Sequence, residues 1–363
     1  MKKAAIITYH FANNYGAILQ CYALQHAISN IGHQCEVVNF VSEKQEDNNS
    51  LYRKYGLKNQ IKNILLLPFH TQRLMREKRI HKFLKEHLSL SPRIKTIEEL
   101  EAYITANDFN YLFSGSDQVW NPMVDDFNQA FFYPFKTTAK KIGYAVSIGK
   151  ASASVLFPYK KWIREFETIT VREETSISVV SELAGKQVKP IVDPVFLLSA
   201  EEWKTIIRDE INQNKYVVAY FVKTDDLDRK VKGAEEIANR MNCKLIIISP
   251  RITKYNLNKT VISDAGPLEF LSLLKNSQFV YTDSFHGTVF SIILNKQFST
   301  IERLEDSNDS RKTDILKKVG LLDRVQYVHK QLNVFSIIDY DNVNKRVNEI
   351  QLDALTFLND LLE

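Results

Sequence analysis

Residues 281–287 combine side chains that could hold an anion and move a proton. A β-rich run ends there and a helical pattern begins at about Gly287, and the N–H groups at a helix start favour an anion. Gly287 would let a ligand come close to the backbone, and His286 can donate or accept a proton near neutral pH. The alternative is that Ser284 only caps the helix and His286 packs in the core.

Two arginines stand where a small anion could be bound. Arg172 follows a predicted strand and precedes a helical pattern, and its planar guanidinium suits a carboxylate or a phosphate. The alternative is a surface salt bridge with Glu173 or Glu174. Arg311 ends the polar run 307–311, where it could complete an anion pocket or serve as an exposed cap.

Residues 114–122 offer the side chains that a sugar site uses. A strand stops at a turn of small residues, and Asp117, Gln118, Trp120 and Asn121 follow. The acid and the amides could bind sugar hydroxyls, and the indole could stack on a ring face. The alternative is a turn that places Trp120 in the core.

Residues 13–20 form the first predicted strand-to-helix loop, where the crevice of a doubly wound domain opens. The loop contains Asn14, Tyr15 and Gly16, which we assign to acceptor binding. It lacks the G-x-G-x-x-G pattern, so dinucleotide binding is disfavoured. Asn14 could also serve only as a helix N-cap.

These motifs follow short β-rich runs that alternate with helical runs, a pattern typical of parallel sheets with crossover helices. The predicted strands are 4–8, 35–40, 111–114, 142–147, 168–171, 216–222, 244–248 and 278–282. The main predicted helices are 17–31, 230–241, 267–275, 287–294 and 340–362. A proline-containing linker is predicted at 189–199.

We therefore predict an α/β protein with two Rossmann-like domains that face a cleft, as in the GT-B architecture. The N-terminal, acceptor-side domain would span 1–190, the C-terminal domain with the His-Gly turn 191–335, and a final helix 336–363. A basic helical insertion near 51–95 has twelve Lys or Arg residues against two acids. It could be solvated helices, or an amphipathic surface that touches anionic lipid or an acidic acceptor.

The composition bounds the function classes. The net charge of +5 is mild, and no nucleic-acid motif accompanies the basic segment, so nucleic-acid binding is disfavoured. Cys21, Cys35 and Cys243 are scattered without zinc spacing, which indicates a reducing compartment and no metal centre. No run of about 20 apolar residues is present. We expect a cytoplasmic protein with peripheral contact to the inner face of the membrane.

With these motifs in view, residues 4 to about 321 resemble the polysaccharide pyruvyl transferase family. The resemblance is carried by residues 14–17 with 19–25, by 115–122, by 171–173, and by 266–270 leading to 282–290. The segment 51–95 is the least family-like part of the chain. The motifs are specific together, although none would be specific alone.

The resemblance implies a GT-B-like fold, phosphoenolpyruvate as the donor co-substrate and no cofactor or strict metal requirement. It implies a hexose or N-acetylhexosamine acceptor in a surface glycan or its lipid-linked precursor, and a cyclic ketal as the usual product. The family's conserved arginine and histidine would fall on Arg172 and His286, and a later basic residue of the donor pocket on Arg311.

The expected chemistry follows from the donor, which carries about three negative charges near pH 7. Arg172, Arg311 and the helix that begins at Gly287 would hold it, with Ser284 at the same turn. His286 would deliver or remove a proton, and Asp117 would orient or deprotonate an acceptor hydroxyl.

Two other functions are compatible with the sequence. A glycosyltransferase with a nucleotide-sugar donor could use the same cleft, with Glu269 holding a ribose. A non-catalytic module could bind a membrane or an acidic polymer through the basic segment.

Overall fold

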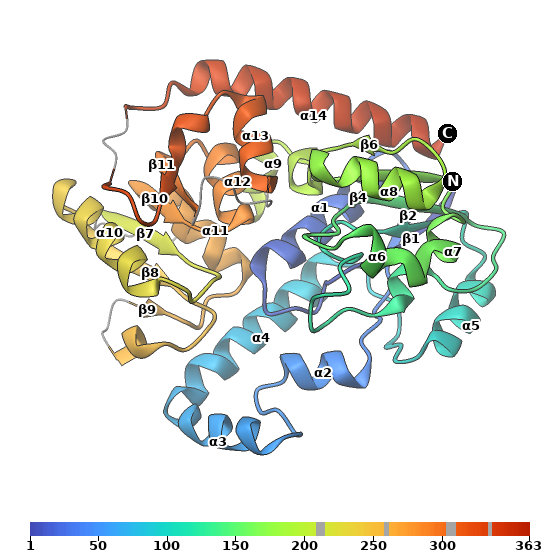
Figure 1. Cartoon of the computed structure of the whole chain (residues 1–363), viewed down its shortest axis with the longest axis horizontal. Helices are drawn as coiled ribbons and strands as arrows, with labels where there is room; N and C mark the ends of the chain where they lie inside the picture. The colour runs from blue at the N-terminus through green and yellow to red at the C-terminus, as the bar shows by residue number, and fades with distance from the viewer. Residues whose placement is uncertain (208–214, 258–260, 303–309, 333–335) are drawn as a thin grey trace. The chain divides into compact units, whose positions relative to one another are not determined.

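The computed structural model describes residues 1–207, 215–257, 261–302, 310–332 and 336–363 (Figure 1). The chain forms two compact units. Unit 1 comprises Met1–Leu65, Leu84–Leu198 and Leu352–Glu363, and unit 2 comprises Leu66–Phe83 and Ser199–Gln351.

Unit 1 is built on a six-stranded parallel sheet of order β2-β1-β3-β4-β5-β6. The strands are β1 (Lys3–Ile7), β2 (Gln34–Val37), β3 (Tyr111–Ser114), β4 (Lys140–Val146), β5 (Thr168–Val171) and β6 (Lys189–Pro190). The helices of this unit are α1 (Tyr15–Asn30), α2 (Glu43–Asn49), α3 (Leu57–Leu65), α5 (Ile97–Asn107), α6 (Ala153–Leu156), α7 (Lys160–Ile163) and α8 (Ile177–Ala184). Its 3-10 turns are η2 (Gln129–Phe132), η3 (Phe157–Tyr159), η4 (Glu174–Ser176) and η5 (Pro194–Leu197).

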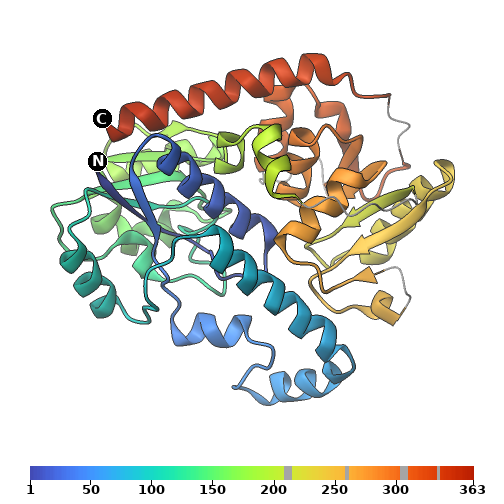
Figure 2. The ribbon, with the colours of Figure 1, turned by 180° about the vertical axis from the view of Figure 1, so that it is seen from behind.

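Both faces of this sheet are covered by helices, as the apolar strands require. Figure 1 shows α6, α7 and α8 in front of the sheet, and Figure 2 shows α1 on the opposite face. Alternation along the strands places Ala5, Ile7 and Leu112 in one core cluster with Leu183 of α8. Two helices, α4 (His70–His87) and α14 (Tyr340–Leu362), have residues in both units.

Unit 2 repeats the plan with a parallel sheet of order β12-β11-β10-β7-β8-β9. The strands are β7 (Tyr216–Tyr220), β8 (Lys244–Ile248), β9 (Val261–Ile262), β10 (Phe279–Thr282), β11 (Phe298–Glu302) and β12 (Val325–Tyr327). The helices are α9 (Ala200–Ile206), α10 (Leu227–Arg240), α11 (Pro267–Asn276), α12 (Phe285–Ile293) and α13 (Arg311–Val319). The 3-10 turns are η1 (Leu67–Phe69), η6 (Lys254–Leu257) and η7 (Leu322–Arg324).

Apolar residues also hold helices to the second sheet. Val231 and Ala234 of α10 join Val217 and other strand residues in one core cluster. Phe270 of α11 packs on Tyr220, with ring centroids 4.8 Å apart. A large apolar side chain buried in this way contributes about 1.5–3 kcal/mol.

The alternating pattern located most strands within three residues of their observed ends. The segment 189–199, predicted to be a linker, instead carries β6 and η5 and belongs to unit 1 as far as Leu198. The basic segment 51–95 is largely helical, and its part Leu66–Phe83 groups with unit 2. Within the described ranges, no helix has the length and apolarity needed to cross a membrane.

Candidate active site

Each sheet has one strand whose neighbours on its two sides are reached by connections that run in opposite directions across the sheet. In unit 1, β2 lies on one side of β1 and β3 on the other, and in unit 2, β8 and β10 flank β7 in the same way. Ligands of open parallel sheets bind beside the carboxyl ends of the strands at such a point. The strand ends at β1/β3 and at β7/β10 are therefore the places to search for a site.

A buried hydrogen-bond ring fixes the turn that follows β3. Gln20 Nε2 donates to Thr8 Oγ1 at 2.9 Å, and Thr8 Oγ1 donates to the carbonyl of Ser116, also at 2.9 Å. The N–H of Ser116 donates to Gln20 Oε1 at 3.0 Å, which closes the ring. Gly115 has φ of +117°, and a Cβ there would lie 2.3 Å from the carbonyl oxygen of Tyr144, so glycine is required. The ring places Asp117 at the strand end.

The ends of three strands then bring one charged cluster together at this edge. Asp117 follows β3, Arg172 and Glu173 follow β5, and Asp193 follows β6. Arg172 Nη1 donates to Asp193 Oδ2 at 2.7 Å, and Nη2 donates to Asp117 Oδ1 at 3.3 Å. Arg172 Nε lies 3.7 Å from Glu173 Oε1. We call these four residues the Arg172 cluster.

The Arg172 cluster is deeply buried and carries more carboxylates than cations. The side chain of Arg172 is 2% exposed and that of Asp193 is 0% exposed, whereas that of Asp117 is 11% exposed. Burial lowers the pKa of Arg172, but attraction by Asp117, then Asp193 and Glu173, outweighs it and raises that pKa overall. Because three carboxylates surround its guanidinium, the geometry does not favour a donor anion at Arg172. Asp117 is the member that a substrate reaches most easily.

Hydrogen bonds from hydroxyl groups hold the carboxylate of Glu173. Ser147, at the end of β4, donates to Glu173 Oε1, and Ser176 donates to Oε2 at 3.3 Å. Asp193 Oδ1 accepts the N–H of Val195 at 3.1 Å and so caps η5. The salt-bridge alternative to a ligand role was thus correct for Glu173, but the bridge is buried and not on the surface.

Trp120 lies in the core, so its predicted stacking on a sugar is wrong. Its side chain is fully buried between Phe132 and Phe166, and its Nε1 donates to Ser114 Oγ at 2.9 Å. Asn121 is also buried, and it donates to the side chain of Gln118 at 2.8 Å. Gln118 is partly exposed, and its backbone N–H binds Asp117 Oδ1 at 2.8 Å. Of the four side chains predicted to bind a sugar, Gln118 is thus the one that is partly exposed, and the buried Asp117 keeps 11% of its side chain exposed.

The first loop is mainly structural. Asn14 is the N-cap of α1, and its side chain accepts the N–H of Gly16 at 3.1 Å. Tyr15 and Gly16 are buried within the first turn of the helix. The N-cap alternative was therefore correct for Asn14, and of these three residues only Asn14 is partly exposed.

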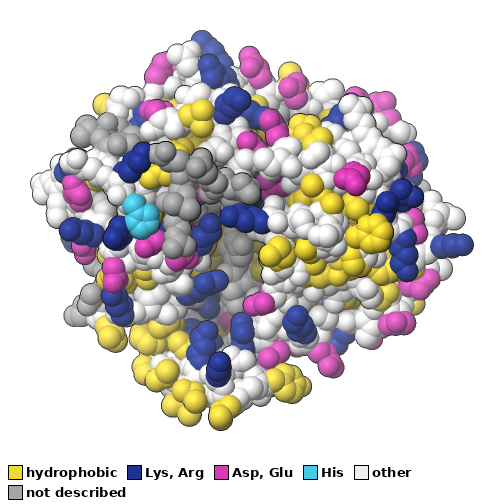
Figure 3. Space-filling view, viewed as in Figure 1, with side chains coloured by type: hydrophobic (Ala, Val, Ile, Leu, Met, Phe, Trp, Pro, Cys, Tyr) yellow, Lys and Arg dark blue, Asp and Glu magenta, His cyan; other side chains and the backbone are white. Residues whose placement is uncertain are grey.

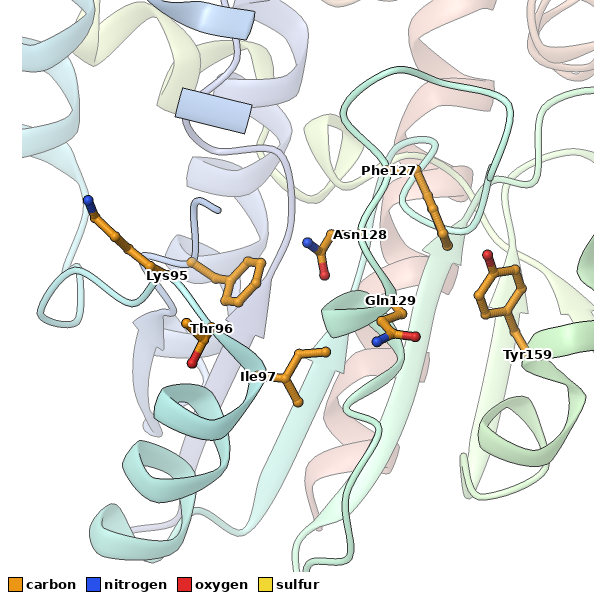
Figure 4. Close-up of a pocket in the computed structure, with 8 residues that line it drawn as sticks. Lys95, Thr96, Ile97, Phe127, Asn128, Gln129 and Tyr159 are labelled. Carbon is orange, nitrogen blue, oxygen red and sulfur yellow. The ribbon is translucent and has the colours of Figure 1, made fainter. Parts of the chain in front are cut away.

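An open hollow of about 420 Å³ lies elsewhere in unit 1, within the range of about 300–1,000 Å³ typical of ligand pockets. Its walls are aromatic, polar and apolar side chains, as Figure 4 shows. The rings of Phe127 and Tyr159 meet edge to face at 5.2 Å. Asn128 caps η2 because its side-chain Oδ1 accepts the N–H of Ala130 at 2.9 Å, and it lies near the middle of the view. Lys95 points away and pairs with Glu46 at 3.4 Å. The hollow thus offers aromatic edges and amides.

The strand ends of unit 2 carry a second buried charge network. Asp283, after β10, pairs with Lys230 at 2.7 Å and accepts the N–H groups of Val222 at 2.7 Å and Lys223 at 3.3 Å. Asp283 therefore joins the ends of β7 and β10 to α10. Lys223 is exposed beside this network.

Lys312, at the start of α13, is the second buried cation here. Its ammonium donates to the carbonyls of Asp283 at 3.0 Å and Ile301 at 2.6 Å, and it pairs with Glu302 at 2.9 Å. Burial lowers the pKa of Lys312, although Glu302 and Asp283 act in the opposite direction. Arg311, predicted to complete the pocket, is half-buried next to it. Residues 307–309 of the same motif lie outside the described residues.

The His-Gly turn follows β10, the strand that also precedes Asp283, as predicted. Ser284 is the N-cap of α12 and accepts the N–H of Gly287 at 3.2 Å, so this N–H is already bonded. A Cβ at Gly287 would lie 2.5 Å from Thr282 Oγ1, which means that this glycine serves close helix–strand packing. His286 is buried with its ring 5.1 Å from that of Phe285. The capping alternative was therefore correct for Ser284.

The model of the family described as polysaccharide pyruvyl transferase matches residues 14–303. The chain belongs to this family. The match includes the Arg172 cluster, Lys230, Asp283 and His286. None of the curated proteins compared with the chain matches it.

Solved structures place this family member among GT-B-fold proteins. UDP-GlcNAc 2-epimerase from Methanocaldococcus jannaschii is 12% identical with a TM-score of 0.53, covering 97% of this chain and 93% of its own. The enzyme from Neisseria meningitidis, solved bound to UDP-GlcNAc, is 11% identical with a TM-score of 0.53, covering 100% and 99%. At such identities the likeness shows the fold, and it confirms the predicted α/β, GT-B-like class of two Rossmann-like domains.

Sequence reasoning missed Lys230, Lys312 and Asp193 in this pyruvyl transferase family member. Asp283 lay within the 281–287 motif but was given no role. For Asp193, the available signal was its position between two prolines in the segment predicted to be a linker. Lys230 lies inside a helix, and no short-range pattern marks it. Within the described residues, no three His, Cys, Asp or Glu side chains converge as metal ligands.

Proposed function

We propose that the protein transfers the pyruvyl group of phosphoenolpyruvate to hydroxyls of a sugar in a surface polysaccharide or its lipid-linked precursor, usually forming a cyclic ketal. The observation that carries the proposal is the family match over residues 14–303, which includes the polar strand ends of both sheets. Phosphoenolpyruvate enters as a co-substrate, and no resident cofactor is proposed.

The donor is assigned to the strand ends of unit 2. Lys223 and Arg311 are the more accessible cations there, while Lys230 and Lys312 donate to the backbone carbonyls of Lys223 and Asp283. A small anion gains charge-assisted hydrogen bonds from such groups. His286 follows β10 at the same edge and is assigned the proton that converts the donor methylene into a methyl group.

The chemistry is then an addition and an elimination. One sugar hydroxyl attacks the central carbon of the protonated donor and gives up its proton, and the bond from this carbon to the phosphate oxygen breaks, so this proton leaves with inorganic phosphate. A second hydroxyl of the same sugar attacks that carbon and returns its proton to His286, which closes the ketal and restores the acid. The products are one ketal and one phosphate for each donor consumed.

The acceptor is assigned to unit 1, with Asp117 as the group that orients or deprotonates a hydroxyl. Arg172 is a positioning residue, because its guanidinium holds Asp117 through a 3.3 Å hydrogen bond. The hollow lined by Phe127, Asn128 and Tyr159 offers edges and amides suited to a further sugar unit.

The test is to incubate the purified protein with phosphoenolpyruvate and a panel of lipid-linked and aryl glycosides. Acceptor-dependent phosphate release with the mass gain of a pyruvate ketal is expected. His286→Ala and Asp117→Asn should each lower turnover by ~10²–10⁴. His81→Ala and Asp125→Asn, at exposed positions, are the matched controls. Full activity in His286→Ala would refute the assignment of the acid.

Nucleotide sugars, supplied as donors in place of phosphoenolpyruvate with the same acceptors, test the glycosyltransferase alternative. No contact of Glu269 favours that alternative. Its carboxylate accepts the N–H of Gly266 at 3.0 Å and lies 3.4 Å from Arg79 Nε, so it caps α11. Turnover of a nucleotide sugar without any use of phosphoenolpyruvate would overturn the proposal.

A further inference from the structure

Helix α3 exposes its apolar stripe to solvent. Leu57, Ile61, Ile64 and Leu65 are 78%, 53%, 66% and 68% exposed. Their spacing places them on one face of the helix, and no residue of α3 is buried. A helix with a purely structural role would bury this apolar stripe against the rest of the protein.

The polar face of α3 is the one that binds the rest of its own segment. Asn63 Nδ2 donates to the carbonyl of Arg53 at 2.9 Å, and Gln60 Nε2 donates to that of Lys54 at 2.8 Å. Asn59 Nδ2 donates to the carbonyl of Tyr55 at 2.8 Å. These amides fix the helix with its stripe outward, so the exposure follows from the contacts of the helix.

The charge of the surrounding segment is wholly positive. Residues 51–76 contain no Asp or Glu, and Lys58 and Lys62 border the stripe along one edge of the helix. Both lysines are exposed, as is Tyr55 at 70%. Figure 3 shows the apolar side chains gathered at the lower edge, where Figure 1 labels α3, with Lys and Arg beside them. We call Tyr55, Leu57, Lys58, Ile61, Lys62, Ile64 and Leu65 the α3 surface.

We propose that the α3 surface binds the surface of an anionic lipid bilayer, with its stripe among the acyl chains and its lysines at the headgroups. An apolar stripe bordered by lysines is the pattern of helices that lie in the membrane interface. Long lysine side chains can keep the ammonium at the headgroups while their stems cover apolar surface. The charge complementarity favours anionic lipid over a neutral protein partner. Such a short helix gives reversible binding.

The test is co-sedimentation of the full-length protein with phosphatidylcholine vesicles, with and without phosphatidylglycerol. Binding should require phosphatidylglycerol and weaken as salt is added. A lysine near an anionic surface contributes roughly fivefold to binding, so Lys58→Ala with Lys62→Ala should weaken it about 25-fold. Ile61→Asp with Ile64→Asp should weaken it by more than about tenfold. Because these positions are exposed, circular dichroism and thermal unfolding should match the wild type.

Two exposed positions outside the α3 surface serve as matched controls. Leu257→Asp changes a leucine that is 78% exposed, and Lys232→Ala removes an exposed lysine of α10. Neither should change vesicle binding. The proposal is overturned if the wild type does not sediment with anionic vesicles, or if the Ile61/Ile64 variant binds equally well. It is also overturned if light scattering shows a lipid-free dimer that this variant abolishes without any vesicle binding.

Discussion

Replacing Arg172 by methionine tests whether the Arg172 cluster holds the edge of the first sheet. The guanidinium is 2% exposed, and its 2.7 Å partner Asp193 is fully buried. Removing one member of a buried ion pair leaves an uncompensated charge and costs about 3–5 kcal/mol. Domains have a free energy of unfolding of only about 5–15 kcal/mol. Arg172→Met should therefore remove a large part of the stability of unit 1.

The assay is urea unfolding together with hydrogen exchange of the β3 and β5 amides, which reports unit 1 by itself. Arg93→Met is the control, because its pair with Glu46 is exposed and should contribute no more than about 1 kcal/mol. Asp193→Asn keeps the oxygen that caps η5, and combining it with Arg172→Met should recover about 1–3 kcal/mol. A loss below about 1 kcal/mol in Arg172→Met, or strictly additive effects, would refute the reasoning.

Three further outcomes follow from the structure. Gly115→Ala should lower the free energy of unfolding by at least about 3 kcal/mol because of the Tyr144 contact, whereas Gly32→Ala, with positive φ but open space, should lose only about 1–2 kcal/mol in chemical denaturation. Burial lowers the pKa of His10 below 6.5 despite its hydrogen bonds, so the stability that the neutral imidazole contributes is full above pH 6.5 and falls as the pH decreases below it. The thermal midpoint of His10→Gln should therefore vary less with pH in that range than the midpoint of the wild type. Equal pH profiles for the two proteins would contradict this. Ser284→Ala loses the α12 cap and should cost about 1 kcal/mol in urea unfolding, and an unchanged midpoint would count against the cap.

The sequence by itself determined the family and most of the strands and helices that carry its motifs. Strands at 111–114 and 168–171 and the helix at 340–362 lie where the apolar pattern predicted them. These features depend on side-chain periodicity and turn residues, which are local properties of the chain. The family motifs likewise lie in short contiguous stretches, so no folding was needed to see them.

The tertiary structure alone decided which charged side chains meet and which face each helix presents. Arg172 is 55 residues from Asp117 and 21 from Asp193, and only the order of β3, β4, β5 and β6 brings the three together. From the sequence, Trp120 could have stacked on a sugar or filled the core. It fills the core, because it packs against Phe132 and Phe166. The α3 stripe is visible in the sequence, but its outward orientation depends on amide contacts. Long-range pairing follows strand order and packing, and neither is encoded in local spacing.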